Sequence, residues 1–468
     1  MKERIKSFLL IFLMVSALFL IKQILGVSGV GIIVTAENSK EALEGASYLL
    51  EDMILPEKKL ISFGENYKTI IYNESDHRLY SSIRDPLAKV LSSKEIKIEE
   101  VGKATDRFID FKFSNPINSF LLSKSLGNNE SNHVPKEIVE IENISIEIGP
   151  DFNKMVLSNS EKAVSIKLPK EDFIEMEEIF TQIEKEENYD YYYSVRSSFG
   201  ADTNLYFPYE ITKNISNVYV DNSLSWMNSA DKRQIARKYL GAALNTAQEM
   251  EEEIGKTVFI AERDILKIED NGIIEYQSIL DRDVKNRNLL ESTNTVIKEI
   301  SEKIPDKKGL YLNRIKEIES GASKGYKFIF EYRIMGYPVL YSTGNYLEMD
   351  VFNDKLKYMR VIERRESKRN SDFPEPGVHI KSSFDILEKE YELFKKYYME
   401  DNKIPVKDIE EVSRNEVISW IKDTRLSFFD NSLKNVGSSL IPAWIFETES
   451  WILGFEALTG NLIYQESK

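Results

Sequence analysis

The spacing of hydrophobic and polar positions predicts a mixture of strands and helices in the first part of the chain. Residues 107–113, R-F-I-D-F-K-F, alternate between apolar and polar side chains, which is the period of a strand with one buried face. We also expect strands at 139–148 and 161–167 and a helix over 84–92. After Pro169 the period changes to that of a helix. The apolar face of this helix carries Phe173, Met176, Phe180 and Ile183.

The middle of the chain repeats this mixture of elements. Two helices are expected, over about 231–254 and over 289–304. Residues 265–279 predict a β-hairpin, because Asn271 and Gly272 form a dipeptide that tight two-residue turns favour. Four strands follow in the segment 325–362. Strands this closely spaced and joined by short turns indicate an antiparallel sheet.

The last part of the chain begins after a polar segment at 367–377, S-K-R-N-S-D-F-P-E-P-G, which is the clearest linker in the sequence. Ser382 and Asp385 then have the spacing of a capping box, which marks the start of a helix. The apolar stripe of this helix consists of Leu387, Tyr391, Phe394 and Tyr398. A second helix is expected over 412–420.

The chain ends in an aromatic segment at 441–464, which predicts a hairpin that turns about Glu449 and Ser450. In that register the facing pairs are Trp444 with Phe455, Phe446 with Leu453, and Thr448 with Trp451. We expect this face to pack as core against the preceding helix. Glu447 and Glu456 lie on the other face, which is mixed in polarity.

These elements predict an α+β fold in which an N-terminal transmembrane helix precedes three extracytoplasmic domains of antiparallel sheet with packed helices. A short cytoplasmic tail and a transmembrane anchor are expected at 1–28. The three domains are expected at 29–188, 189–370 and 371–468, the last being the smallest.

The anchor, residues 8–25, is an apolar run from Phe8 to Ile21 that continues after Lys22 and Gln23 to Leu25. Its length is close to the roughly 20 residues that span a bilayer. Lys2, Arg4 and Lys6 precede it, so the positive-inside rule places the N-terminus in the cytoplasm and the bulk of the chain outside the cell membrane. A cleaved signal peptide is the alternative, but no A-x-A site follows the run.

A cytoplasmic tail this short cannot fold by itself, so a signal to the cell interior must pass through the membrane helix or through a partner protein. Phe12, Ser16 and Phe19 fall on one side of the anchor at helical spacing. Partner helices often dock on small or hydroxyl residues. We therefore predict that these three residues form a transmembrane contact face.

Composition removes several classes of function. The chain has 77 acidic and 62 basic residues and a formal net charge of −15, which disfavours binding to nucleic acid. It contains no cysteine, and its three histidines, His77, His133 and His379, are far apart in sequence. We therefore predict no metal site and no cofactor. Because the sequence contains no nucleotide-binding, serine-hydrolase or zinc-protease motif, we also predict no catalytic residues and no enzymatic activity.

Two features keep an alternative function open. Glu447 and Glu456 lie on facing predicted strands, and glycoside hydrolysis uses a pair of carboxyl groups. The run Y-D-Y-Y-Y at 189–193 has aromatic side chains of the kind that stack on sugars, although an aromatic strand at a domain junction is the simpler interpretation. The alternatives are a cell-wall glycan-binding or hydrolytic protein, or a PepSY-like inhibitor of an extracellular protease.

Three parts of the sequence carry a resemblance to a known family. They are the N-terminal run E-R-I-K-S-F-L-L-I-F-L-M-V-S-A-L, the segments 325–341 and 349–360, and the segments 440–447 and 456–463. These parts are similar to the anchor, the middle strands and the closing strands of the YycH/YycI family. The long block that precedes residue 325 is typical of the longer, YycH-type members. The family consists of accessory membrane proteins of the WalK/WalR (YycG/YycF) two-component system of Gram-positive bacteria.

The resemblance implies an extracytoplasmic regulator without enzymatic activity, held at the cell membrane beside a WalK-like sensor histidine kinase. It implies a YycI-like sibling as a second partner and a membrane helix that modulates a kinase controlling cell-wall metabolism. The small C-terminal domain is then PepSY-like. Neither the resemblance nor the residues decide whether the protein activates or inhibits the kinase.

Overall fold

The computed structural model describes residues 50–64, 67–72, 78–93, 105–128, 138–212, 214–253, 255–372, 376–405, 410–431 and 438–468. Among these residues no helix is both long and apolar enough to cross a membrane. The expected anchor at 8–25 and its contact face, Phe12, Ser16 and Phe19, lie outside the described residues and stay predictions.

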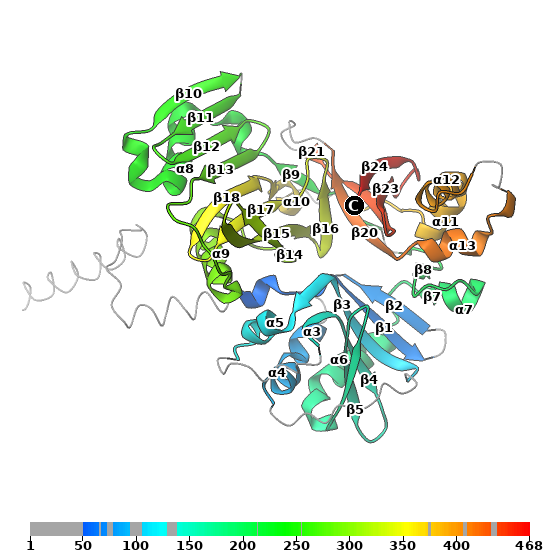
Figure 1. Cartoon of the computed structure of the whole chain (residues 1–468). Helices are drawn as coiled ribbons and strands as arrows, with labels where there is room; N and C mark the ends of the chain where they lie inside the picture. Colours follow the sequence, from blue (N-terminus) through cyan, green and yellow to red (C-terminus); the bar gives the residue numbers. More distant parts are fainter. Residues whose placement is uncertain are drawn as a thin grey trace, which may run out of the picture. The chain divides into compact units, whose positions relative to one another are not determined.

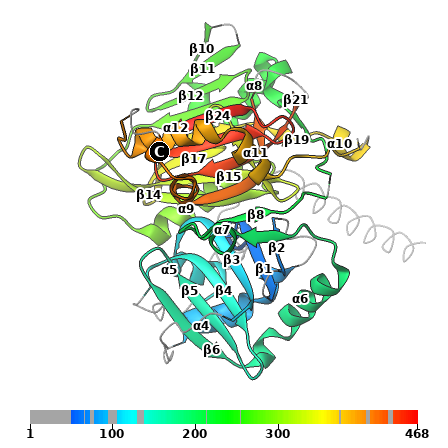
Figure 2. The ribbon, with the colours of Figure 1, turned by 90° about the vertical axis from the view of Figure 1, so that its right-hand side faces the viewer.

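The first sheet has eight antiparallel strands in the order β6-β5-β4-β3-β1-β2-β7-β8 (Figure 1). Its strands are β1 Lys58–Gly64, β2 Tyr67–Ile71, β3 Arg107–Asn118, β4 Glu140–Ile148, β5 Asn153–Ser158, β6 Ala163–Leu168, β7 Tyr192–Ser194 and β8 Tyr206–Pro208. The helices that accompany it are α3 Leu79–Ser82, α4 Arg84–Ser92, α5 Ser119–Ser125 and α6 Ile174–Glu186, and a short helix α7 Val195–Phe199 follows β7. Figure 2 shows α4 and α6 beside this sheet.

The two faces of the first sheet differ because successive strand residues point to opposite sides. Phe63 of β1 points to the helix-covered face, where its ring lies 5.1 Å from that of Phe180 in α6. Asp110 and Lys112 of β3 pair with Leu60 and Lys58 and point to the opposite face. The predicted alternation of this strand is therefore confirmed, and its polar side faces the second sheet.

The second sheet has thirteen strands, in the order β10-β11-β12-β13-β18-β17-β15-β16-β20-β22-β23-β24, with β14 paired to β15. The strands before residue 370 are β10 Gln248–Glu253, β11 Lys256–Ile260, β12 Asp264–Glu269, β13 Ile273–Ser278, β14 Leu310–Ser320, β15 Ser323–Ile334, β16 Tyr337–Tyr341, β17 Leu347–Phe352 and β18 Lys355–Ile362. The later strands are β20 Asp423–Asp430, β22 Ile441–Glu447, β23 Trp451–Glu456 and β24 Leu462–Ser467. Its helices are α8 Ser229–Leu240, α9 Leu289–Lys303, α11 Ser383–Lys389, α12 Tyr391–Asp401 and α13 Arg414–Trp420.

One strand pairing carries this sheet across the expected boundary at residues 370 and 371. β16 and β20 pair in parallel, with Val339 opposite Phe428 and Tyr341 opposite Asp430. The other pairings of the sheet are antiparallel, as the hairpin signals predicted. The expected domain boundaries stay predictions, but the middle and C-terminal strands share one sheet.

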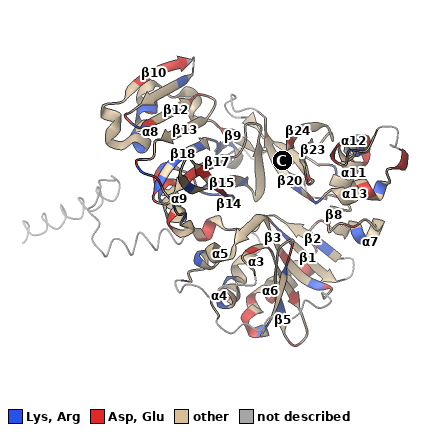
Figure 3. Ribbon diagram, in the orientation of Figure 1, with Lys and Arg blue, Asp and Glu red and all other residues tan. Residues whose placement is uncertain are grey.

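One expectation about secondary structure was wrong, and one strand of the first sheet was not predicted. The helix predicted over 231–254 ends at Leu240, and the chain then forms the acidic edge strand β10 (Figure 3). Gly241 lies at φ 54°, a conformation that glycine adopts readily and that ends helices. The charges of β10 suit an exposed sheet edge. The strand β5 was missed because Met155, Val156 and Leu157 form a run without alternation.

The start of the expected linker at 367–377 forms secondary structure. A small sheet places β9 (Tyr219–Asp221) between β19 (Arg365–Glu366) and β21 (Ser438–Ser439), and a short helix α10 (Arg369–Asp372) follows β19. The guanidinium of Arg369 lies 3.9 Å from the ring centre of Tyr219. Contacts made by distant residues therefore order a segment whose composition suggested a free linker.

The C-terminal hairpin has the predicted register. Trp444 pairs with Phe455 and Phe446 with Leu453, and the backbone N–H of Thr448 donates to the carbonyl of Trp451. The ring of Phe394 in α12 lies 4.9 Å from Phe446 and 5.2 Å from Phe455. The aromatic segment is therefore core, as expected, and the capping box of Ser382 and Asp385 is also present.

A buried ion pair joins the segment just after β18 to the end of β20. The Nε atom of Arg364 lies 3.0 Å from Oδ2 of Asp430, and each side chain is 1% exposed. A charge at this depth is costly without its partner, so the pair holds β20 at the end of β18.

We predict that Arg364→Met lowers the free energy of unfolding by about 3–5 kcal/mol, because it removes the guanidinium that faces the buried Asp430. Arg196→Met is the matched control. Its pair with Asp202 is exposed, at 56% and 91%, so a change below about 1 kcal/mol is expected. Urea-induced unfolding of both variants measures the difference, and equal effects would contradict the structural role of the buried pair.

Candidate functional site

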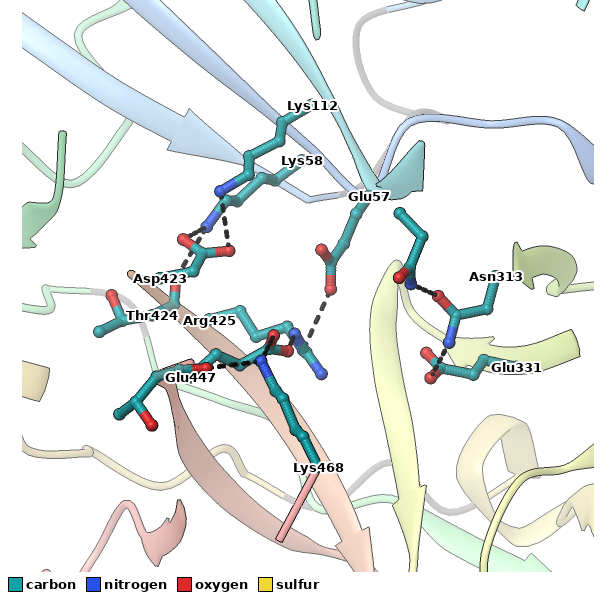
Figure 4. Close-up of polar contacts among 12 residues, drawn as sticks. Glu57, Lys58, Lys112, Asn313, Glu331, Asp423, Thr424, Arg425, Glu447 and Lys468 are labelled. Atoms are coloured by element: carbon teal, nitrogen blue, oxygen red, sulfur yellow. Dashed lines mark hydrogen bonds and ion pairs between the residues drawn. The ribbon is translucent and has the colours of Figure 1, made fainter. Parts of the chain in front are cut away.

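The two sheets meet at a cluster of charged residues supplied by both (Figure 4). Its first part surrounds Asp423, at the start of β20. The Nζ atom of Lys58 lies 2.5 Å from Oδ1 of Asp423, and that of Lys112 lies 3.1 Å from Oδ2. Lys58 also donates to the carbonyl oxygen of Thr424 at 2.8 Å. Burial would raise the pKa of Asp423, but the two lysines outweigh it and hold that pKa well below its ordinary value.

The second part of the cluster surrounds Arg425, two residues further along β20. Its Nε atom lies 3.1 Å from Oε1 of Glu57, just before β1, and its Nη1 atom donates to Glu447 of β22. Lys468 reaches the other oxygen of Glu447 at 3.3 Å. Burial opposes the charge on Arg425, but Glu447 and Glu57 raise its pKa well above the ordinary value. The guanidinium therefore links the N-terminal strand to the C-terminal hairpin.

A chain of neutral and charged polar groups extends the contact toward β14 and β15. Asn115 of β3 donates to Asn313 at 2.6 Å, and Asn313 donates to Glu331 at 2.6 Å. Arg314 donates from Nε back to Asn115 at 2.7 Å. Burial raises the pKa of Glu331 above its ordinary value. The buried carboxyl group therefore depends on its hydrogen bonds, such as the one that Asn313 donates.

The alternation of β20 explains why these groups face the first sheet. Asp423 and Arg425 share one face by period two, and Glu447 joins it because it pairs directly with Asp423. Leu426 and Phe428 point to the opposite face, where Leu426 pairs with Trp444. The mixed face of the predicted hairpin is therefore the face that meets the first sheet.

A polar cleft of about 820 Å³ lies beside this cluster. Its floor is the polar face of the first sheet, and its walls come from residues 196–206 and from the start of β20. Asp110 lies on the floor and accepts a hydrogen bond from Ser145. Burial and the neighbouring Glu147 raise the pKa of Asp110 to about 6, against the opposing effects of Ser145 and Lys112. A carboxyl group with a raised pKa in a cleft is a candidate functional group.

The structure separates the residues that suggested a glycosidase. Glu456 sits opposite Ala443, four positions from Glu447 along β22, which corresponds to about 13 Å. Glycosidase carboxyls lie roughly 5–10 Å apart. Glu447 is also not on a solvated face, since Arg425 and Lys468 hold it, and Glu456 instead accepts a hydrogen bond from Thr459. This pair is therefore not an acid and base facing one substrate.

The aromatic run 189–193 is largely structural. Tyr192 is buried, Tyr189 stacks on Phe63 with ring centres 5.1 Å apart, and the ring of Tyr193 lies 6.2 Å from that of Phe207. No group of three or more His, Cys, Asp or Glu in the described part of the chain is placed to hold a metal. His77 and His133 lie outside that part.

Sequence reasoning did not select the residues of the cluster or of the cleft. Asp110 and Lys112 are polar positions of the strand 107–113. Their opposite charges on one face of this strand were the signal from which the sequence could have indicated them. Asp423 and Arg425 lie on a strand whose partner across the cleft is remote in sequence, so periodicity does not reveal them.

We predict that Asp423→Asn lowers the free energy of unfolding by about 3 kcal/mol, because Lys58 and Lys112 lose their shared carboxylate at a largely buried site. Asp354→Asn is the matched control, since Asp354 also faces two cations, Arg282 and Lys355, but at the surface. A change below about 1 kcal/mol is expected there. Chemical unfolding at neutral pH compares the two, and an unaffected Asp423→Asn variant would exclude the cluster as a fixed junction.

We predict that Asp110→Asn removes a pH dependence from the stability of the folded chain. The pKa of Asp110 is about 6 in the folded state and 3.8 ordinarily, so the folded state holds the proton more tightly. Stability from this group is therefore lost as the pH rises from about 4 to 6. Relative to the native chain, Asp110→Asn gains more in melting temperature at pH 7.5 than at pH 4. Melting curves that stay parallel across this range would contradict the raised pKa.

Comparison with known proteins adds a structural likeness. The chain is similar to the crystal structure of YycH from Bacillus subtilis, with a TM-score of 0.54 and 11% identity over 86% of this chain and 95% of that one. Lower TM-scores of 0.35 and 0.25 relate it to an uncharacterized protein from Eubacterium rectale and to the YpeB C-terminal domain from Bacillus megaterium, at 13% and 12% identity. These two cover 56% and 52% of this chain, and 90% and 97% of their own.

No family model matches the chain, and no curated protein sequence matches it. At 11% identity the likeness to YycH concerns the fold. It extends over both sheets, because it covers most of each chain. The chain therefore has a YycH-like fold.

Proposed function

We propose that this protein is a membrane-anchored, extracytoplasmic regulator of a WalK-like sensor histidine kinase, with a YycI-like sibling as its second partner. The observation that carries the proposal is the YycH-like fold over 86% of the chain. The sequence resemblance to the YycH/YycI family, which includes the N-terminal run, also supports it. In this proposal the protein has no catalytic role and acts in the control of cell-wall metabolism.

The route of the signal follows from the expected anchor at residues 8–25. In this proposal the protein acts on the kinase through contacts between membrane helices and between extracytoplasmic parts. Such contacts need to favour one kinase state by only about 1–3 kcal/mol to change its output several-fold. The charge cluster contributes by joining the two sheets, so that a contact made by either sheet constrains the other.

Replacing the anchor, residues 8–25, by an unrelated membrane helix tests the helix route. We expect transcription that depends on the kinase to change at least about twofold in cells, because the specific helix contact is lost while the protein stays at the membrane. A reporter gene under control of the response regulator measures this. Unchanged transcription at equal protein levels would exclude the helix route.

A pair of triple variants locates the contact face within the anchor. Phe12→Ala, Ser16→Leu and Phe19→Ala together change the proposed face, whereas Leu10→Ala, Met14→Ala and Ile21→Ala change positions about half a turn away at helical spacing. Only the first variant is expected to reproduce the effect of the anchor replacement. If the second variant has the same effect, the contact face is assigned wrongly.

A further inference from the structure

In the cleft beside the charge cluster, the cations have ion-pair partners and two of the carboxylates do not. Its cations are all paired: Lys58 and Lys112 bind Asp423, Lys422 lies 3.1 Å from Glu449, and Arg196 lies 2.8 Å from Asp202. Each cation that lines the cleft therefore has a carboxylate of the chain itself as a partner, and Lys58 and Lys112 share one.

Two carboxylates of the cleft, Asp110 and Glu142, have no such partner. Neither takes part in an ion pair with any described residue, and Lys112, the cation nearest to Asp110 on the same strand, is held by Asp423. Asp110 is half-buried, and burial disfavours its negative charge as the protein stands. Asp110 therefore presents to the cleft a carboxylate that is not in an ion pair with any described residue.

The rest of the lining consists of groups that make neutral hydrogen bonds. Asn143 and Ser145 of β4, Ser158 of β5, and Asn204 and Tyr206 of the opposite wall line the cleft. Ser145 sits directly opposite Asp110 in the sheet, and Ser158 directly opposite Asn143, so the polar groups lie in two neighbouring rows on one face of three strands. A space of about 820 Å³ is within the range of small-molecule sites.

We infer that this cleft binds a small molecule that is rich in hydroxyl or amide groups and also carries a protonated amine. The amine donates a charge-assisted hydrogen bond to the carboxylate of Asp110. Asn143, Ser158 and Tyr206 are placed to bind the neutral groups of the same molecule. An amino sugar and the free amino end of a short polar peptide share this chemistry. A metal ion is a poorer fit, because no group of three or more ligating side chains occurs among the described residues.

Binding through Asp110 depends on pH because the amine pairs with the ionised carboxylate. The groups that surround this carboxyl are Ser145 and Glu147 of β4, Lys112 of β3, and Tyr206 of β8. Burial and the charge of Asp110 raise the pKa of Tyr206. Glu147 favours protonation of Asp110, whereas Lys112 and Ser145 favour the ionised form. The pKa of about 6 leaves Asp110 mostly ionised at pH 7 and mostly protonated at pH 5.

This inference goes beyond the proposed regulation of a kinase. A small molecule bound in the cleft would be an extracytoplasmic signal for that regulation. Binding is measured by isothermal titration calorimetry on the purified full chain in detergent micelles, without kinase, so its outcome is independent of the kinase proposal. The probes are D-glucosamine against D-glucose, and triserine against N-acetyl-triserine. We expect each probe with a free amine to bind about tenfold or more tightly than its neutral analogue at pH 7.

The variant Asp110→Asn tests the residue. It is expected to weaken binding of the amine-bearing probe at least about tenfold, and lowering the pH from 7 to 5 is expected to weaken binding to the native chain by a similar factor. Glu161→Gln, an exposed carboxylate in the β5–β6 turn, is the matched control and is expected to bind as the native chain does. A preference for D-glucosamine or for triserine identifies the source of the amine.

Three results would overturn the inference. One is equal binding of charged and neutral probes, which would exclude recognition of the amine. Another is unchanged binding by Asp110→Asn in a chain that melts as a folded protein does. The last is no binding of either amine-bearing probe at about 50 mM, a concentration at which even the weakest specific small-molecule sites fill.

Discussion

The contact between the two sheets depends on charged groups that neither sheet satisfies alone. Lys58 and Lys112 come from the first sheet and their carboxylate, Asp423, from the second. Arg425 of the second sheet lies between Glu57, before β1, and Glu447 of β22. A largely buried charge is costly without its partner, so these pairs permit one relative placement of the strands that carry them. The polar row from Asn115 to Glu331 extends the same constraint to β14 and β15.

The ion pairs of this junction determine which charged groups of the neighbouring cleft have no ion-pair partner. Asp423 takes both lysines of the floor, so Asp110 is left with a hydroxyl partner, Ser145, and with the like charge of Glu147 nearby. Burial is the main cause of the raised pKa of Asp110, and Lys112 opposes it. Structural pairing and the chemistry of the cleft are linked, because Lys112 pairs with Asp423 and also acts on the charge of Asp110.

The elements of the fold follow largely from local pattern. The alternation of 107–113, the capping box at Ser382 and the register of Trp444 with Phe455 are present as the sequence predicts. The helix predicted over 231–254 failed where Gly241 ends it, and β5 was missed because a short apolar run has no readable period. A likeness to YycH at 11% identity agrees with a fold that depends on pattern more than on particular residues.

The sequence by itself determined the class of the fold, the aromatic core of the C-terminal hairpin, the antiparallel character of the middle strands and the absence of cysteine chemistry. Periodicity, turn residues and composition are local properties. Only the tertiary structure decided which charges meet. Lys58 and Asp423 are 365 positions apart, and β16 joins β20 across the segment that appeared to be a linker. No local pattern encodes such pairings, because an ion pair depends on where two strands lie in space. The cleft with Asp110 exists only once those strands have been brought together.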